Sequence, residues 1–291
     1  MKTKKLLIIL IISSFLIASI IFYSEKDVIL TYVRHDNQQA ENSVPEQIFF
    51  QAPSLEAKSA YVFDLSEDKI IFELNSELQL PLASLTKLMT ALVARENILD
   101  WMMVEITPEA ILTEGDSGFF AGEKWPVSDL TKTMLISSSN DAAAALALNA
   151  CQLDFLGLMN KKAVEMGLTQ TYFFNPTGLD LNNYLAGAYG SAQNIAGLIS
   201  YIFKKYPDLL ESTQQDSVVI NYRNFKNTDL LINQLPGILA SKTGYSDLAG
   251  GNLAIIADAG FHNPVVIVVL GSSEQGRFED VKKLYEETLK Y

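Results

Sequence analysis

Residues 81–91 read PLASLTKLMTA, a run of apolar residues that contains one serine, two threonines and one lysine. From Ser84 onward the apolar residues recur at helical spacing, which predicts a helix with one buried face. The apolar stripe consists of Leu85, Leu88, Met89, Leu92 and Val93. Ser84 and Lys87 stand three positions apart, so their side chains share one face of this helix and can touch.

The same serine–lysine spacing occurs again at Ser66 and Lys69. That copy lies in a polar turn beside Glu67 and Asp68, where a lysine keeps its charge. Ser84 instead follows the apolar LPLA and opens an apolar-striped helix. A serine at a helix start is more often a cap than a nucleophile, so the spacing alone leaves both roles open for Ser84.

Strand patterns lie on both sides of this helix along the chain. Before it, AYVFDLSEDKIIFEL (60–74) predicts two short strands around a polar turn. The last third predicts three more strands, ASKTGYS, NLAIIADAG and PVVIVVLGS, and then a closing helix from about Arg277 to Lys290. Residues from about 100 to 212 are largely helical by pattern. We therefore predict an α+β fold, with one antiparallel sheet completed by both ends of a domain at 55–291 and an inserted helical subdomain.

The amino-terminal segment predicts a membrane anchor. Residues 6–23, LLIILIISSFLIASIIFY, contain no charged residue and follow a basic tail at 1–5. As a helix they would span about 27 Å, close to the hydrocarbon thickness of a bilayer. We predict a single-pass signal anchor with the tail in the cytoplasm, a polar spacer at 24–54 and an extracytoplasmic domain at the cell membrane. A cleaved signal peptide is the alternative, and it exports the domain equally.

Composition excludes several classes of function. The 22 Lys and Arg against 34 Asp and Glu give a net charge of -12, which argues against a nucleic-acid partner. Cys151 is the single cysteine, and His35 and His262 are the two histidines. We therefore expect no metal site, no disulfide framework and no histidine base.

Lys87 can act as a base only if its amine loses a proton. At an ordinary pKa near 10.4, about one lysine in 2,500 is neutral at pH 7, a penalty of roughly 4.6 kcal/mol. Burial, a helix amino terminus or a second cation can lower that pKa. Lys242 in the KTG sequence (242–244) is the candidate second cation. There Thr243 adds a hydroxyl and Gly244 permits close approach of a substrate backbone, although an ordinary edge-strand turn is the alternative.

A third motif is the SxN sequence at Ser138 and Asn140, within ISSSNDAA. Its alternative role is helix capping by Asn140 or Asp141 ahead of the alanine-rich run. SxxK, SxN and KTG in this order are nevertheless the serine acyl-transfer set of penicillin-binding proteins and β-lactamases.

Five stretches carry a wider resemblance: PLASLTKLMTA, EGDSGFFAGEKW, SSSNDAAAALA, MNKKAVEMGLTQTYFFNPTGLD and SKTGYSDLAGGNLA. Over about residues 55–272 the chain resembles the serine D-alanyl-D-alanine carboxypeptidases, which are low-molecular-mass penicillin-binding proteins. The resemblance implies a β-lactamase/transpeptidase-like fold with a five-stranded sheet against helices, and a site between the sheet and the helical subdomain. It also implies a reaction without a cofactor.

The same resemblance implies roles for individual residues. Ser84 would form the acyl-enzyme, Lys87 would take its proton and Ser138 would complete the proton network. The implied substrate-binding residues are Asn140, Lys242, Thr243, Gly244 and Tyr245. Among these, Lys242 would draw in the terminal carboxylate of the substrate, and the backbone N–H groups of Ser84 and Tyr245 would form the oxyanion hole.

The implied activity is removal of the terminal D-Ala from peptidoglycan stem peptides, with β-lactams as inhibitors. A DD-endopeptidase acting on cross-links and a non-catalytic penicillin-binding or wall-binding module are the alternatives. A β-lactamase is disfavoured, because no ExxLN-like segment follows the SxN motif. The chain departs from the family at Ser139, where glycine is usual, at Tyr245 and in LNNYLAGAYG (181–190). Family members often carry a carboxy-terminal β-domain with a membrane helix, and we expect the amino-terminal span to replace that anchor.

Overall fold

The computed structural model describes residues 50–291, apart from 113, 114, 116, 117, 151–153 and 261, together with Ser19 and Phe22. Residues 50–291 form one compact unit. The predicted tail, anchor and spacer therefore lie almost wholly outside the described residues and stay predictions. No helix within the described part of the chain has the length and apolar character needed to cross a membrane.

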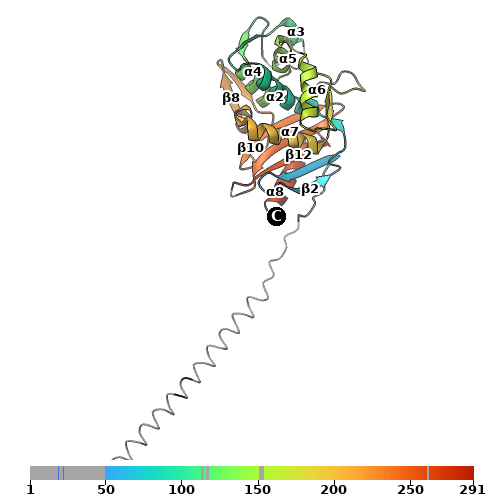
Figure 1. Ribbon diagram of the computed structural model, residues 1–291, viewed down its shortest axis with the longest axis vertical. Coiled ribbons are helices and arrows are strands. Elements are labelled where there is room, and N and C mark those ends of the chain that lie inside the picture. Colours follow the sequence, from blue (N-terminus) through green and yellow to red (C-terminus); the bar gives the residue numbers. More distant parts are fainter. Residues whose placement is uncertain are drawn as a thin grey trace, which may run out of the picture. The chain divides into compact units, whose positions relative to one another are not determined.

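A five-stranded antiparallel sheet is the centre of the fold, as predicted (Figure 1). Its order is β10-β11-β12-β1-β2. The bounds are β1 Ser59–Asp64, β2 Lys69–Leu74, β10 Ile238–Ser246, β11 Gly250–Asp258 and β12 Pro264–Ser272. The amino-terminal hairpin completes the sheet beside the last strand, with Ser59 opposite Leu270. This order leaves β10, which carries the KTG sequence, at one edge.

Helices cover both faces of the sheet, which explains the continuous apolar runs of β11 and β12. Successive residues of these strands alternate between two cores: Ile256 and Val268 join one, and Ile255 and Ile267 join the other. The second core is closed by α8 (Gly276–Thr288) through Phe278, Val281 and Leu284. On the other face, α7 (Ala192–Lys205) packs against β12 and β1.

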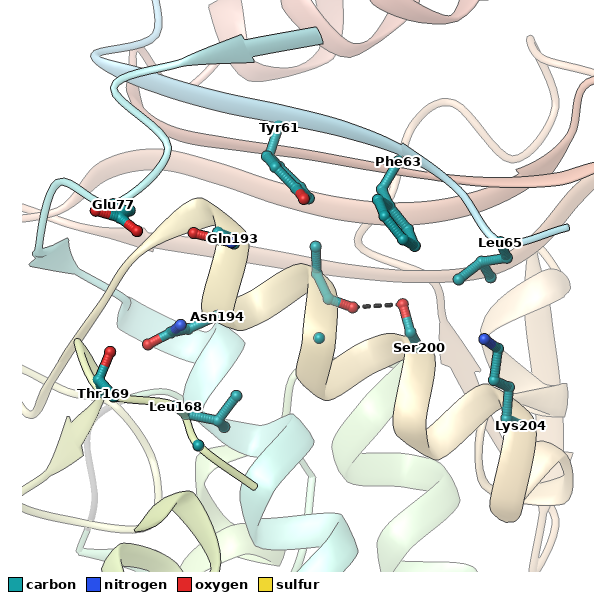
Figure 2. A pocket seen from close by; sticks show the side chains of 13 residues that line it. Tyr61, Phe63, Leu65, Glu77, Leu168, Thr169, Gln193, Asn194, Ser200 and Lys204 are labelled. Atoms are coloured by element: carbon teal, nitrogen blue, oxygen red, sulfur yellow. Dashed lines mark hydrogen bonds between the residues drawn. The ribbon is translucent and has the colours of Figure 1, made fainter. Parts of the chain in front are cut away.

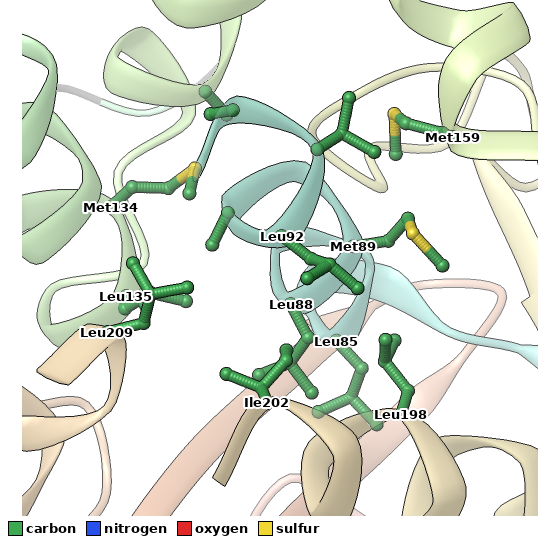
Figure 3. Close-up of a cluster of buried hydrophobic side chains, with 14 of the residues drawn as sticks. Leu85, Leu88, Met89, Leu92, Met134, Leu135, Met159, Leu198, Ile202 and Leu209 are labelled. Carbon is green, nitrogen blue, oxygen red and sulfur yellow. The ribbon is translucent and has the colours of Figure 1, made fainter. Parts of the chain in front are cut away.

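The helix predicted from residues 81–91 is buried on nearly all sides. It begins as a 3-10 turn, η1 (Ala83–Thr86), and continues as α2 (Lys87–Asn97). Leu85, Leu88, Met89 and Leu92 are fully buried. Around them lie Met134 and Leu135 of α4, Met159 of α6, and Leu198 and Ile202 of α7 (Figure 3). This packing holds the serine–lysine pair at a fixed place between the helices and the sheet.

The segment predicted as a helical subdomain contains short strands as well as helices. The helices are α3 Pro108–Ile111, α4 Val127–Ile136, α5 Asn140–Asn149 and α6 Phe155–Glu165, followed by α7. The short strands within this segment are β4 Met103–Glu105, β5 Lys124–Pro126, β6 Tyr172–Phe173 and β7 Ala188–Gly190. Outside it lie β3 Leu80–Pro81, β8 Ser217–Ile220 and β9 Arg223–Lys226. The pairing β3-β7-β6 ties the residues just before Ser84 to the loops that follow α6.

Candidate active site

Ser84 does not cap a helix in this structure. It lies within η1, and neither η1 nor α2 has a side-chain hydrogen bond at its amino-terminal cap. The Nζ atom of Lys87 lies 2.8 Å from Ser84 Oγ. The structure therefore favours the pair that the SxxK spacing predicts over the capping alternative.

Lys87 is fully buried and its amine has three polar neighbours. Besides Ser84 Oγ, these are Asn140 Oδ1 at 2.7 Å and the carbonyl oxygen of Thr177 at 2.8 Å. A neutral amine has two N–H bonds and one lone pair, so it can donate to the two carbonyl-type oxygens and accept the Ser84 O–H. Burial, and then the charge of Lys242, hold the pKa of Lys87 well below its ordinary value. The geometry and the charge environment thus favour the form of Lys87 that can act as a base.

The SxN motif lies at the junction of α4 and α5. Ser139, and not Asn140 or Asp141, caps α5, since its Oγ accepts from the N–H of Ala142 at 3.1 Å. Ser138 has a left-handed backbone with φ of 60°, a conformation that a non-glycine residue adopts at some energetic cost. This backbone accompanies the contact between Ser138 Oγ and the Lys242 amine at 2.9 Å.

Lys242 is also buried, with 1% of its surface exposed. Its amine donates to Ser138 Oγ and, at 2.9 Å, to the carbonyl of Thr243. Burial, followed by the charge of Arg277, lowers the pKa of Lys242 to about 7, and Asp229 partly opposes this shift. The site therefore holds a second ammonium group whose charge is sensitive to pH near neutrality.

The rest of the KTG sequence brings β10 against the start of α2. A Cβ added to Gly244 would lie 2.9 Å from the carbonyl oxygen of Leu82 and 3.2 Å from the Ser84 nitrogen, so only glycine fits this approach. Thr243 Oγ1 lies 2.5 Å from Thr228 Oγ1. Tyr245 follows with 48% of its surface exposed. Gly244 thus packs closely against the backbone of Leu82 and Ser84. The close approach of a substrate backbone stays a prediction.

The structure therefore brings the predicted site residues together at one edge of the sheet. Ser84, Lys87 and Asn140 form one hydrogen-bonded group, and Ser138 and Lys242 form a second. Within the described residues no group of His, Cys, Asp and Glu could hold a metal ion. The arrangement provides a hydroxyl beside a buried amine, with a second buried cation close by, which suits acyl transfer through a serine ester.

Comparison with known proteins agrees with this geometry. Residues 46–274 match the peptidase S11 family, described as D-alanyl-D-alanine carboxypeptidase. The chain belongs to this family. It is 33% identical over 246 residues to the D-alanyl-D-alanine carboxypeptidase DacF of Bacillus subtilis, a match that covers 79% of this chain and 61% of DacF. It is 32% identical to a D-alanyl-D-alanine endopeptidase of Pseudomonas aeruginosa, covering 79% of this chain and 76% of the relative.

Solved structures of this class share the fold. Penicillin-binding protein D2 from Listeria monocytogenes, in its ampicillin-bound form, superposes with a TM-score of 0.71 at 28% identity. The match covers 82% of this chain and 99% of that protein. Penicillin-binding protein 6B from Escherichia coli gives a TM-score of 0.71 at 29% identity, covering 81% and 78% of the two chains. The predicted β-lactamase/transpeptidase-like fold is confirmed.

Several polar groups of the candidate site were not found from the sequence. Thr177 contributes a backbone carbonyl, which no sequence pattern reveals. Arg277, at the start of α8, donates to the carbonyl of Gly244 at 2.7 Å. Asn252 is fully buried on β11 and donates to the carbonyls of Pro81 and Leu82 at 2.9 and 3.1 Å, so it fixes the chain just before Ser84. A polar residue within an apolar strand pattern is the signal that would have identified Asn252.

A separate cleft of about 380 Å³ lies between β1 and α7 (Figure 2). Tyr61 and Phe63 point from the strand toward the helix, where Asn194 and Ser200 lie. None of the residues with a predicted catalytic or binding role lines this cleft. The cleft is therefore separate from the groups formed by Ser84, Lys87 and Asn140 and by Ser138 and Lys242.

Gly178→Ala is expected to disturb Ser84 through its neighbour Ala83. Gly178 has φ of 82°, and an added Cβ would lie 1.9 Å from the carbonyl oxygen of Ala83. We expect a loss of about 2 to 4 kcal/mol in unfolding free energy, from left-handed strain plus the forced backbone shift, together with slower acylation of Ser84.

Gly167→Ala is the matched control for this clash. Gly167 has φ of 69°, and nothing lies within 4 Å of its added Cβ, so this variant loses only the conformational term of about 1 kcal/mol. Denaturant unfolding and β-lactam acylation rates of both variants provide the comparison. Equal effects of the two substitutions would show that the contact with Ala83 is unimportant.

Proposed function

We propose that this protein is a serine D-alanyl-D-alanine carboxypeptidase that removes the terminal D-Ala of peptidoglycan stem peptides. The observation that carries the proposal is the 2.8 Å contact between Ser84 Oγ and the amine of a fully buried lysine, Lys87. Family membership supports it. The chain matches 61% of the length of DacF, and we extend the activity to this chain on the strength of its site.

In the proposed reaction, Ser84 Oγ attacks the carbonyl carbon of the penultimate D-Ala while Lys87 accepts the hydroxyl proton. The backbone N–H groups of Ser84 and Tyr245 bind the developing oxyanion. The C–N bond then breaks, and the terminal D-Ala leaves with the proton that Lys87 took from Ser84. Water, deprotonated by the same lysine, hydrolyses the ester and restores the Ser84 hydroxyl.

Lys242 is proposed to bind the terminal carboxylate of the substrate, with Thr243 as a hydrogen-bond donor. Its ammonium group comes from β10 and donates to Ser138 Oγ at 2.9 Å. The chain is acidic overall, with a net charge of -12, but Lys242 and Arg277 place positive charge in this one region. A local positive potential of this kind can attract an anionic peptide end to an anionic protein.

The direct test is incubation of the protein with a pentapeptide ending in D-Ala-D-Ala, followed by an assay for free D-alanine with and without penicillin. The proposal predicts release of D-alanine that penicillin abolishes. Absence of release under conditions where Ser84 is labelled by a fluorescent penicillin would instead favour a non-catalytic penicillin-binding module. We also propose that β-lactams acylate Ser84, since Listeria penicillin-binding protein D2 has been solved in ampicillin- and cefotaxime-bound forms.

A DD-endopeptidase that cuts cross-links between stem peptides is the second candidate, because the Pseudomonas aeruginosa relative carries that name. The same residues serve both reactions. Cross-linked muropeptide dimers and monomeric pentapeptides offered in one incubation distinguish them by the product that appears first.

We propose further that the domain works at the outer face of the cell membrane, held by residues 6–23. The uncharged apolar length of this segment and the basic tail before it support the proposal. Fractionation of cells that produce the full chain tests it, since an anchored protein stays with the membranes after a wash with high salt.

The pH dependence of the reaction follows from the two lysines. Lys87 must be neutral and Lys242 must be charged, so activity rises as Lys87 loses its proton and falls as Lys242 loses its own. With the pKa of Lys242 at about 7, we expect kcat/KM for a carboxylate substrate to decline above that pH. A bound carboxylate raises the pKa of Lys242, so the alkaline limb of kcat should lie at higher pH than that of kcat/KM.

Profiles of both parameters from about pH 5 to 10 check this expectation. A substrate whose terminal carboxylate is amidated should lack the alkaline limb near 7. The same limb in both substrates would show that another group is responsible.

A further inference from the structure

Asn182 and Asn183, in the segment at 181–190, form one wall of a cleft beside the active site. The loop turns back on itself through the pairing of Asn182 with Leu185. Just before it, Asp180 binds the turn between β10 and β11: its Oδ1 accepts from Ser246 Oγ at 3.0 Å and its Oδ2 from the Leu248 N–H at 3.2 Å. The two walls of the cleft are therefore fixed to each other.

This cleft has a volume of about 580 Å³ and directly continues the KTG strand. It is lined by Leu179, Asp180, Asn182, Asn183, Tyr245, Ser246, Asp247 and Leu248. Tyr245 is the neighbour of Gly244, whose backbone packs against Ser84. An extended peptide that places its penultimate residue at Ser84 and runs along β10 advances about 3.3 Å per residue. We infer that the peptide continues past Tyr245 toward Ser246, which brings the residue before the penultimate D-Ala to this cleft.

The lining of the cleft has a definite chemistry. None of its residues is basic, and the amides of Asn182 and Asn183 share it with two carboxylates. Both oxygens of Asp180 already accept hydrogen bonds. Asp247 is exposed and has no hydrogen-bond or ion-pair partner among the residues that the structure describes. Asn182 Oδ1 accepts from the Tyr184 N–H at 2.8 Å and keeps a second lone pair. The cleft thus offers the Asp247 carboxylate and neighbouring amide oxygens to a positively charged group.

We propose that Asp247 recognises the side-chain ammonium group of the diamino acid that precedes D-Ala-D-Ala in the stem peptide. Asp247 is then a specificity-determining residue, and the loop at 181–185 provides the amide oxygens that complete the contact. The proposal rests on the proposed carboxypeptidase function. It predicts that the enzyme distinguishes a free amine at this position from an acylated one.

The test compares two substrates, Nα-acetyl-L-lysyl-D-Ala-D-Ala and its Nα,Nε-diacetyl analogue. We expect the native protein to prefer the free amine by about fivefold in kcat/KM at low ionic strength, a size typical of a partly exposed ion pair. Asp247→Asn should remove the preference and leave turnover of the diacetyl substrate within about twofold. Asp247→Glu should keep it, and added salt should weaken it.

Asp68→Asn is the matched control. Asp68 is exposed in the turn between β1 and β2, at the opposite edge of the sheet from β10, and its φ of 52° suits asparagine. This variant loses the same charge and should keep the full preference. Retention of the preference in Asp247→Asn, or equal rates of the native protein on both substrates, would overturn the role of Asp247 and leave the proposed carboxypeptidase function standing. Failure of the native protein to release D-alanine from either substrate would overturn the proposed function itself.

Discussion

Lys87→Ala is expected to slow acylation of Ser84 by at least about 10³-fold, because general bases contribute factors of this order. The variant leaves Ser84 in place but removes the amine that lies 2.8 Å from its Oγ. Acylation rates with a fluorescent penicillin give the measurement. Normal labelling of the variant would remove Lys87 from the mechanism.

Loss of a buried lysine also affects stability, so a second variant is needed. In Lys87→Ala, the buried Thr177 carbonyl loses a donor, which costs about 1 to 3 kcal/mol, and the half-buried Asn140 Oδ1 loses a donor as well. Lys87→Met keeps most of the side-chain volume and should be equally inactive. Lys161→Ala, at an exposed lysine of α6, should acylate at the native rate. Circular dichroism confirms that each variant is folded before its rate is compared.

Lys242→Ala is expected to lower kcat/KM by about 10² or more for substrates with a free terminal carboxylate, because it removes the charged anchor. Amidated substrates should lose much less. Equal loss on both kinds of peptide would contradict the role of Lys242 as a carboxylate anchor.

The same variant has a second consequence for the pH profile. Lys242 is one of the two causes that lower the pKa of Lys87, so removing its charge raises that pKa. The acidic limb of the profile should therefore move to higher pH in Lys242→Ala. The two effects are separated by comparing substrates at a pH above this limb.

Local patterns predicted the parts of the fold in which burial imposes a period. The apolar runs of β11 and β12 and the stripe from Leu85 to Val93 were found because a face of each element must be buried. The partner of each face was not predictable in the same way. The helix α7 lies in the segment predicted as a helical subdomain, yet it packs against the five-stranded sheet, since an amphipathic pattern defines a buried face without saying what covers it.

The site was predictable where side-chain types carry the chemistry. Ser84 and Lys87 are three residues apart, and a helix alone brings them together. The contact of Ser138 with Lys242 joins residues 104 positions apart. The resemblance to a known family assigned both residues to one site but did not predict that they touch. The Thr177 carbonyl and the charge of Arg277 depend on tertiary packing, so no local pattern predicted them.

The most direct test of this account is the pKa of the Lys87 amine in the folded protein. It can be followed by NMR titration of lysines labelled at Cε, with the signal assigned through Lys87→Met. We predict that Lys87 of the native protein titrates well below the ordinary pKa near 10.4. In Lys242→Ala the pKa of Lys87 should be higher than in the native protein, because one of the two causes that lower it is gone. An ordinary pKa for Lys87 would mean that the buried amine holds its proton at neutral pH and does not activate Ser84.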